Sequence, residues 1–500
     1  MRRVFAAFAA LTICVLASGC ATFRSYDKEL NSTLGQVSSG NVDGAINVLQ
    51  SNNKSDKKDL LYYFELGELQ RLKDRYPDSQ QSWRSADQRV KAWEETAKIN
   101  PAKLLGGAGS LLLNDKSLPY EGHDYEKVML TTRMALNFLA MNDFDDARVA
   151  ITQTHEREAV ITDLRAKQVA EVEKDAAKRG AKTNFKELNG YPVESIDNPE
   201  VNALKNSYQS ALSHYLAGYI YEAQGEPSLA AAGYRQAIEL QPNQPLLDEA
   251  LRGLDQRVSA PANDVTDVLF VVESGTAPAR ESRSFPLPIP VNRTLVLIPV
   301  SFPVMQSTSS AYLPAQLTVD GDDPLKVVPI TSIDAMARRA LKDEMPGIIL
   351  RGVIRSGTKA VAQYQLQHEG QRRDNLLLGL AGIALSIGSV ITESADERTW
   401  RTLPARIAIA RGRLPPGTHS ITLQTAAGSR TVRVTVAGRY AVVGLRLLQG
   451  QLFVMAPETQ LAASDAGRRP SRPATDADST KSTTTAPTTF EENPSAEKPR

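Results

Sequence analysis

The segment HYLAGYIYEAQGEPSLAAAGYRQAIELQP, His214–Pro242, decides the fold that we expect for the first half of this chain. Two stretches rich in helix-forming residues flank Gly225, a residue type that commonly ends a helix. Pro227 follows at a position where a second helix can begin without losing a hydrogen bond, and Pro242 stops that helix. The segment therefore predicts two antiparallel helices joined by a tight turn.

Small and aromatic residues recur inside this hairpin at a spacing that resembles the tetratricopeptide repeat signature. Gly218 and Ala230 are small where two helices would cross closely, and tyrosines fill the space beside them. The matching positions are Gly218, Tyr221, Gly225, Ala230, Tyr234, Ala237 and Pro242. We expect all of them to be structural residues.

Weaker copies of the same pattern lie upstream. The corresponding residues are Gly67, Trp83 and Ala86 in Leu60–Ala86, Ala135, Phe138, Ala147 and Ile151 in Thr131–Ile151, and Gly40 and Ala45 in Thr33–Leu49. One helical hairpin cannot bury its own apolar face, so several copies in a row predict a short solenoid. We expect a tetratricopeptide-like helical repeat domain over residues 20–258, in which a long helix, Asp145 to about Lys178, extends as an arm.

The pattern changes near Pro261, after which β-branched residues become frequent. Val265–Glu273 and Thr294–Val300 are typical of strands, and the alternating residues Ile421–Val436 indicate a β-hairpin. Four prolines, Pro286, Pro288, Pro290 and Pro303, are expected in the connections between strands. The sequence predicts a mixed, β-rich domain over residues 262–460.

Two helices are also expected in this second domain. The first is Ile333–Gln367, with Pro346 as its expected break, and the second is Asn375–Ala395. The apolar run Leu376–Ile391 is shorter than the roughly 20 residues that a membrane span requires, so we expect it to be buried. From residue 463 to 500 the chain has almost no large apolar residues, which predicts a disordered tail. The fold class is therefore α+β.

The N-terminus resembles a lipoprotein signal peptide over residues 1–19. Arg2 and Arg3 precede a short apolar run, and Ala17-Ser18-Gly19 leads to Cys20, the residue expected to carry lipid. The resemblance departs from the usual motif at Ala17, where a larger aliphatic residue is common, so an ordinary cleaved leader is the alternative. In lipoproteins of this class, a residue other than Asp directly after the cysteine favours the outer membrane, and Ala21 stands at that position. We expect the chain to face the periplasm.

Composition excludes several classes of function. Cys14 and Cys20 are the two cysteines of the sequence, so the mature chain has no disulfide and no thiol nucleophile after position 20. Lys and Arg total 58 against 57 Asp and Glu, which gives no bulk charge that would favour nucleic acid. The five histidines have no metal-ligand spacing and the sequence has no nucleotide-binding loop or hydrolase elbow, so we expect no metal, no cofactor and no enzyme.

One loop gathers acids, aromatic residues and a histidine before a helix. Its members are Tyr120, Glu121, His123, Asp124, Tyr125 and Glu126. Loops carried on a rigid frame often hold function, so this loop is the candidate interaction site. Paired carboxylates could act on a glycan. Alternatively, Asp124 and Glu126 favour the helix N-terminus and the tyrosines pack it down.

The whole layout resembles a family of uncharacterised Gram-negative outer-membrane lipoproteins with helical repeats at the N-terminus. The residues that carry this resemblance are Leu118–Gly122, Asp143–Arg148 and Trp400–Pro404, together with the repeat and lipid motifs. The resemblance implies no activity. We expect a scaffold that binds envelope proteins in the groove of its repeats; the alternatives are a glycan-binding or peptidoglycan-cleaving lipoprotein that uses Glu121 and Glu126, and an activator of a cell-wall synthase.

Lipidation is directly testable. Cells grown with a palmitate analogue should label the wild-type chain, and the Cys20→Ala variant should stay unlabelled and leave the membrane fraction, because an acyl chain contributes about 0.8 kcal/mol per buried methylene. An unlabelled wild-type chain would contradict the predicted anchor.

Overall fold

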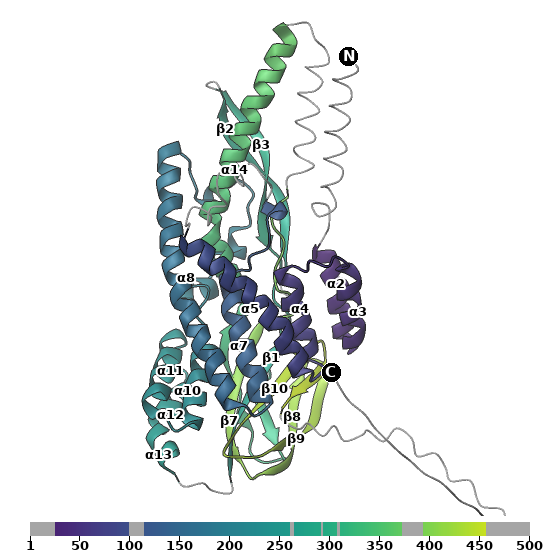
Figure 1. Cartoon of the computed structure of the whole chain (residues 1–500), viewed down its shortest axis with the longest axis vertical. Coiled ribbons are helices and arrows are strands. Elements are labelled where there is room, and N and C mark those ends of the chain that lie inside the picture. The colour runs from purple at the N-terminus through teal and green to yellow at the C-terminus, as the bar shows by residue number, and fades with distance from the viewer. Residues whose placement is uncertain are drawn as a thin grey trace, which may run out of the picture. The chain divides into compact units, whose positions relative to one another are not determined.

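The computed structural model describes residues 26–99, 115–260, 265–291, 294–307, 311–372 and 394–456 (Figure 1). The predicted signal peptide with Cys20, the apolar run Leu376–Ile391 and the predicted disordered tail 463–500 lie outside the described residues. Those expectations therefore stay predictions.

Four helical hairpins form the first half of the described chain (Figure 1). They are α2 (Tyr26–Ser38) with α3 (Val42–Asn52), α4 (Leu60–Arg71) with α5 (Tyr76–Ile99), α7 (Asp124–Ala140) with α8 (Phe144–Arg179), and α10 (Ala211–Ala223) with α11 (Pro227–Leu240). Successive hairpins pack together, since α3 contacts α4, α5 contacts α7, and α8 contacts α10. The stack of hairpins is confirmed. Shorter helices follow or interrupt it: α9 (Pro199–Ala203), α12 (Pro245–Arg252) and α13 (Leu254–Ser259).

Polar side chains cap several of these helices, and the glycine and proline predicted for the α10–α11 turn are found there. The side chains of Asp59, Asp143 and Ser210 accept hydrogen bonds from the first-turn amides of α4, α8 and α10. Gly225 adopts a φ of 76°, which allows the turn between α10 and α11, and Pro227 is the first residue of α11.

Small residues allow the helices of a hairpin to cross closely. A Cβ atom at Gly218 would lie 2.5 Å from the ring of Tyr234, and one at Gly67 would lie 2.3 Å from Trp83. Gly233, which the repeat pattern did not mark, tolerates a side chain least, because its Cβ would lie 2.6 Å from the backbone nitrogen of Gly218, and backbone cannot move aside as a side chain can. Tyr221 differs from the expected packing, since it is only partly buried and its hydroxyl lies 3.2 Å from Thr152 of α8.

The second half contains two packed sheets. The five-stranded sheet has the order β11-β10-β1-β7-β6, in which β1 is parallel to β10 and antiparallel to β7. Its strands are β1 (Thr266–Ser274), β6 (Val328–Ser332), β7 (Arg406–Leu414), β10 (Tyr440–Leu448) and β11 (Gln451–Met455). The four-stranded sheet has the order β5-β4-β8-β9 and comprises β4 (Gln316–Val319), β5 (Leu325–Lys326), β8 (Gly417–Thr425) and β9 (Gly428–Val436).

The five-stranded sheet is the middle layer. Along β1, Leu269 and Val271 belong to a core shared with the helices, whereas Val268, Phe270 and Val272 belong to a core shared with the four-stranded sheet. Successive side chains of a strand point to opposite faces, so both faces of β1 are covered. The α+β fold class, with helices first and sheets after them, is confirmed.

The sheet covers the inner face of the helical stack. All 17 residues of α7 are buried, and α7 contacts β10. Tyr219 of α10 donates its hydroxyl proton toward the carbonyls of Asp267 and Ala441, at 2.6 Å and 2.9 Å. The expected open groove of the repeats is therefore not present among the described residues, because the chain fills it with its own sheet.

A separate two-stranded ribbon, β2 (Arg280–Val291) with β3 (Thr294–Met305), corrects the expected role of the prolines. Pro286, Pro288, Pro290 and Pro303 lie inside these strands and not in their connections. Pro286 pairs with Pro299, and the pairs that contain the other three prolines lie an even number of positions away along the two strands. At alternate positions of an antiparallel strand the backbone N–H points away from the partner strand. Proline, which lacks this N–H, therefore breaks no hydrogen bond between the two strands at such positions.

The helix α14 (Ile333–Arg372) corrects a second expectation, because it continues through Pro346 without a break. It runs beside β2 and β3 (Figure 1), where Gly352 allows close packing on Val300 and Phe302. Its Leu350 also forms a small apolar cluster with Val172 and Ala176 of α8. The long helix expected from Asp145 to about Lys178 is confirmed as α8. The cluster with Leu350 shows that the C-terminal part of α8 packs against α14.

The close crossing of α10 and α11 predicts opposite effects for two Gly→Ala variants. Gly233→Ala should reduce the free energy of unfolding by about 2 kcal/mol, because the backbone of α10 must move. Gly35→Ala in α2 should be neutral or stabilising, since nothing lies within 4 Å and alanine favours helix. Chemical denaturation of both variants tests this, and equal stabilities would contradict the crossing.

Candidate functional site

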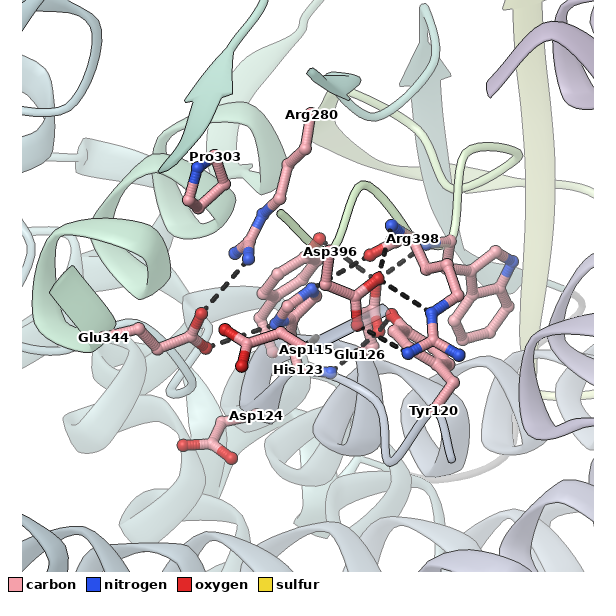
Figure 2. A network of polar contacts seen from close by, with 12 residues as sticks. Asp115, Tyr120, His123, Asp124, Glu126, Arg280, Pro303, Glu344, Asp396 and Arg398 are labelled. Carbon is pink, nitrogen blue, oxygen red and sulfur yellow. Dashed lines mark hydrogen bonds and ion pairs between the residues drawn. The ribbon is translucent and has the colours of Figure 1, made fainter. Parts of the chain in front are cut away.

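A cleft of about 470 Å³ opens where the helical stack, the ribbon and α14 meet. The loop that precedes α7 forms one wall, and α5, α8, β2, β3 and α14 contribute the others. Its apolar lining residues are Trp93, Leu118, Pro119, Ile161, Leu164, Pro303 and Ile348. Charged residues of both signs lie among them, and Figure 2 shows the polar network that surrounds the loop.

Glu126 fixes the loop to the N-terminus of α7. One carboxylate oxygen accepts the backbone N–H of His123 at 2.8 Å and the hydroxyl of Tyr120. The other accepts the hydroxyl of Tyr125 at 3.2 Å and the backbone N–H of Trp400 at 2.7 Å. Glu126 is 0% exposed, so it is a structural anchor whose two oxygens each have two donors.

His123 connects the loop to distant parts of the chain. Its Nδ1 lies 3.2 Å from the carboxylate of Glu344 on α14, and its Nε2 lies 3.2 Å from the carbonyl of Arg398. The ring also stacks on Tyr125, with 5.9 Å between centroids. The two ring nitrogens thus connect the loop to α14 and to the segment around Arg398.

Glu344 connects His123 and Arg280, as Figure 2 shows. Besides His123 it accepts hydrogen bonds from Arg280 at 3.1 Å and from Arg165 at 3.3 Å. Burial raises the pKa of this carboxyl, but the nearby charges of His123, Arg280 and Arg165 outweigh burial and hold the pKa well below its usual range. Glu344 is therefore a carboxylate that gathers a histidine and two arginines from three elements.

A second acid of the loop region is equally paired. Asp124 accepts hydrogen bonds from Arg165 of α8 and, at 3.5 Å, from Lys127. Lys127 lies over the ring of Trp93, 3.3 Å from its centroid. Burial lowers the pKa of Lys127, against the opposing effect of Asp124. The wall near α5 is thus an apolar surface with neutralised charges beneath it.

Glu121 is the member of the loop that stays exposed, at the rim of the cleft. Crowding by protein atoms raises the pKa of its carboxyl, although Lys127 acts in the opposite direction. The two predicted carboxylates therefore differ in access. Glu121 can meet a ligand, whereas Glu126 is enclosed.

The other side of the loop is held by residues 115–118 and 396–398. Lys116 bonds Glu397 at 3.2 Å, and Arg398 donates to the carbonyl of Leu118 at 2.9 Å. Arg398 also lies over the ring of Tyr120, 5.2 Å from the centroid. Trp400 is buried beside this segment, and the charges next to it are paired and only partly exposed.

The sequence located the loop but not its partners. The structure places Tyr120, His123 and Asp124 in one wall, with Glu121 at the rim, whereas Tyr125 and Glu126 are fully buried and do not line the cleft. Sequence reasoning missed Arg165, Arg280, Glu344 and Arg398, which lie in unremarkable charged surroundings far along the chain. The repeat residues from Gly218 to Pro242 contribute nothing to the cleft.

This arrangement favours binding over acid–base chemistry, because the buried acids of the wall already have cationic or N–H partners. Within the described ranges no group of three or more His, Cys, Asp or Glu could hold a metal ion. No helix in the same ranges is long and apolar enough to cross a membrane.

No family model matches the sequence, and no curated protein matches it. Among solved structures, a tetratricopeptide repeat protein from Parabacteroides merdae is similar to this chain. The similarity covers 46% of this chain and 98% of that one, with 14% sequence identity and a TM-score of 0.13. We draw no functional conclusion from so low a score.

Glu65 of α4 lies behind the loop and accepts the backbone N–H groups of Arg401 at 2.7 Å and Thr402 at 3.1 Å. Burial raises its pKa to about 7, against the lowering effect of these hydrogen bonds. The folded state therefore holds this proton more tightly than the unfolded state, whose pKa is near 4.5. The resulting stabilisation is complete below pH 4.5 and is lost as the pH rises through 7.

Between pH 5 and pH 8, we expect the free energy of unfolding of the wild type to fall by about 2 kcal/mol relative to that of Glu65→Gln. The glutamine cannot titrate, so it removes this one contribution. Urea unfolding of both proteins at each pH measures the difference. A gap that does not change with pH would contradict the raised pKa.

Proposed function

We propose that the chain is a lipid-anchored, periplasm-facing scaffold of the outer membrane that binds an envelope protein in the cleft beside the Tyr120–Glu126 loop. The observation that carries this proposal is the pairing of an apolar wall with charges that are almost all neutralised internally. Such a surface supports binding of a protein segment through apolar contacts and a few directed polar groups.

The location of the cleft also supports the proposal. The face that a helical stack commonly offers to partners is occupied here by the chain's own sheet. The cleft lies at the edge of that filled face, and residues of α5, α7 and α8 still form much of its wall. The repeats therefore contribute to binding as the wall of this cleft.

The fixed positions of the lining residues support a preformed site. Arg165, Arg280 and Glu344 come from α8, β2 and α14, and each is held by hydrogen bonds to side chains of another element. A wall with few free rotamers loses little entropy when a partner binds. Such a site suits a scaffold, which must hold a partner in one orientation.

The glycan alternative is less well supported. Of its two carboxylates, Glu121 is exposed but Glu126 is fully buried and saturated with donors. An activator of a cell-wall synthase differs from the main proposal only in the identity of the partner.

Position-specific crosslinking in intact cells tests the proposal. A photo-crosslinking amino acid in place of Glu121, at the rim of the cleft, should yield an adduct with an envelope protein. The same amino acid in place of Arg235, exposed on α11 away from the lining residues, is the matched control and should yield none. The adduct is identified by mass spectrometry.

Equal adducts at both positions, or none at Glu121, would contradict the proposal. Incubation with purified peptidoglycan separates the alternative, since release of fragments by the wild type but not by Glu121→Ala would favour a hydrolase.

A further inference from the structure

Arg280, the first residue of β2, is a buried arginine of the cleft that is only partly satisfied. It is 2% exposed and lines the cleft beside Pro303 and Glu344 (Figure 2). Its Nη1 donates to Glu344 at 3.1 Å. Its Nε and Nη2 are shielded from bulk solvent and have no hydrogen-bond partner among the described residues.

Leaving such donors unbonded is costly. A buried polar group without a partner costs about 1–3 kcal/mol, and more if the group is charged. Buried polar groups of folded proteins are paired in the large majority of cases. The two free donors of Arg280 therefore require an explanation in the chemistry of the cleft.

The two free nitrogens form one edge of the guanidinium group. Nε–H and Nη2–H point the same way from that planar group, and this fork matches the two oxygens of a carboxylate. Glu344 uses the remaining nitrogen and holds the plane of the group in place. Arg280 is thus oriented by one carboxylate and has a second, bidentate edge that no described residue occupies.

The neighbouring cations do not offer the same opportunity. Lys127 and Arg165 face Asp124, and Arg351 faces Asp115 at 3.4 Å. Each of these cations is paired with a protein carboxylate and, unlike Arg280, has no buried nitrogen without a hydrogen-bond partner among the described residues. A ligand anion is therefore best accommodated at Arg280.

We propose that the free edge of Arg280 binds the C-terminal carboxylate of a partner protein whose last residues fill the cleft. This inference rests on the proposed scaffold function and names the part of the partner that is recognised. The apolar side chains of those residues would lie against Trp93, Ile161 and Ile348.

The charges of the cleft favour one carboxylate over several. Five acidic residues line it, namely Asp115, Glu121, Asp124, Glu344 and Asp396. A cell-wall stem peptide or a phosphorylated ligand would place further anionic groups near these acids, and like charges repel. A protein C-terminus has a single terminal charge and apolar neighbours, which is the complement of this lining.

The size of the cleft favours a chain end over an internal segment. A volume of about 470 Å³ lies in the lower part of the range of small-molecule pockets. A chain that continued in both directions would need an open groove on two sides. A chain that ends in the cleft needs only one opening.

The test uses the full-length lipidated protein in detergent and two matched peptide pools. Both contain N-acetylated hexapeptides with four randomised final positions; one pool ends in a free carboxylate and the other in an amide. Mass spectrometry measures which peptides the protein retains. We expect at least tenfold greater retention of the free acids, with apolar residues enriched before the end.

Two arginine variants locate the effect. Arg280→Lys keeps a cation beside Glu344 but loses the bidentate edge, so retention of the acids should fall at least tenfold. Arg235→Lys, exposed on α11 away from the lining residues, is the control and should retain them as the wild type does. Thermal unfolding of both variants confirms that they fold.

Equal retention of acids and amides, unchanged binding by Arg280→Lys, or no retention at all would overturn the inference. Retention of a soluble stem peptide in place of the free-acid pool would also overturn it. The scaffold proposal is judged separately by the crosslink at Glu121, which reports any partner protein whichever part of it enters the cleft.

Discussion

The guanidinium of Arg133 joins the helices to the sheet, and much of the described structure depends on this contact. Arg133 lies on α7 and donates hydrogen bonds to Glu68 of α4 and Glu273 of β1; all three residues are 0% exposed. Burial lowers the pKa of Arg133, but the two carboxylates raise it above its ordinary value. An arrangement that separated any of these charges from its partners would be strongly disfavoured, because loss of one partner of a buried pair typically costs about 3–5 kcal/mol. The triad therefore fixes α4, α7 and β1 relative to one another.

That constraint reaches the cleft through α7. Because β1 and α4 hold the middle of α7, the N-terminus of the helix has one position relative to the sheet. There Glu126 meets the backbone N–H of Trp400, and Trp400 stacks on Phe64 of α4 with 4.4 Å between ring centroids. The loop from Tyr120 to His123 is then tied to this anchor, and Glu344 completes the wall from α14. The cleft is thus a product of the contacts that join the helices to the sheet.

The sequence predicted the local elements well because their causes are local. Gly225 and Pro227 act within one hairpin, and Gly67 meets Trp83 within another, so spacing alone locates them. The sequence did not show what covers the inner face of the stack. Strand β10 begins with a continuous apolar run, residues 440–443, and not with alternating apolar and polar residues. Such a run is compatible with a strand buried on both faces and with a buried helix. The partners of the loop were missed for a similar reason. Glu344 lies 221 positions from His123, and no residue near Glu344 marks it as different from any other helical glutamate.

In this chain the sheet covers the face that a helical stack commonly offers to partners, so the stack is rigid but lacks a large binding face. The remaining cleft is small, so affinity there must come from a few well-directed groups and from little loss of motion on binding, and not from area. Its charges fit that requirement, since almost every cation is already held by an acid of the protein and cannot attract ligands indiscriminately. Arg280 differs from the others in having a buried edge without a partner, which lowers stability in the unliganded state. A ligand that satisfies this edge recovers that loss as binding energy, which makes the least satisfied residue of the wall the best determinant of specificity.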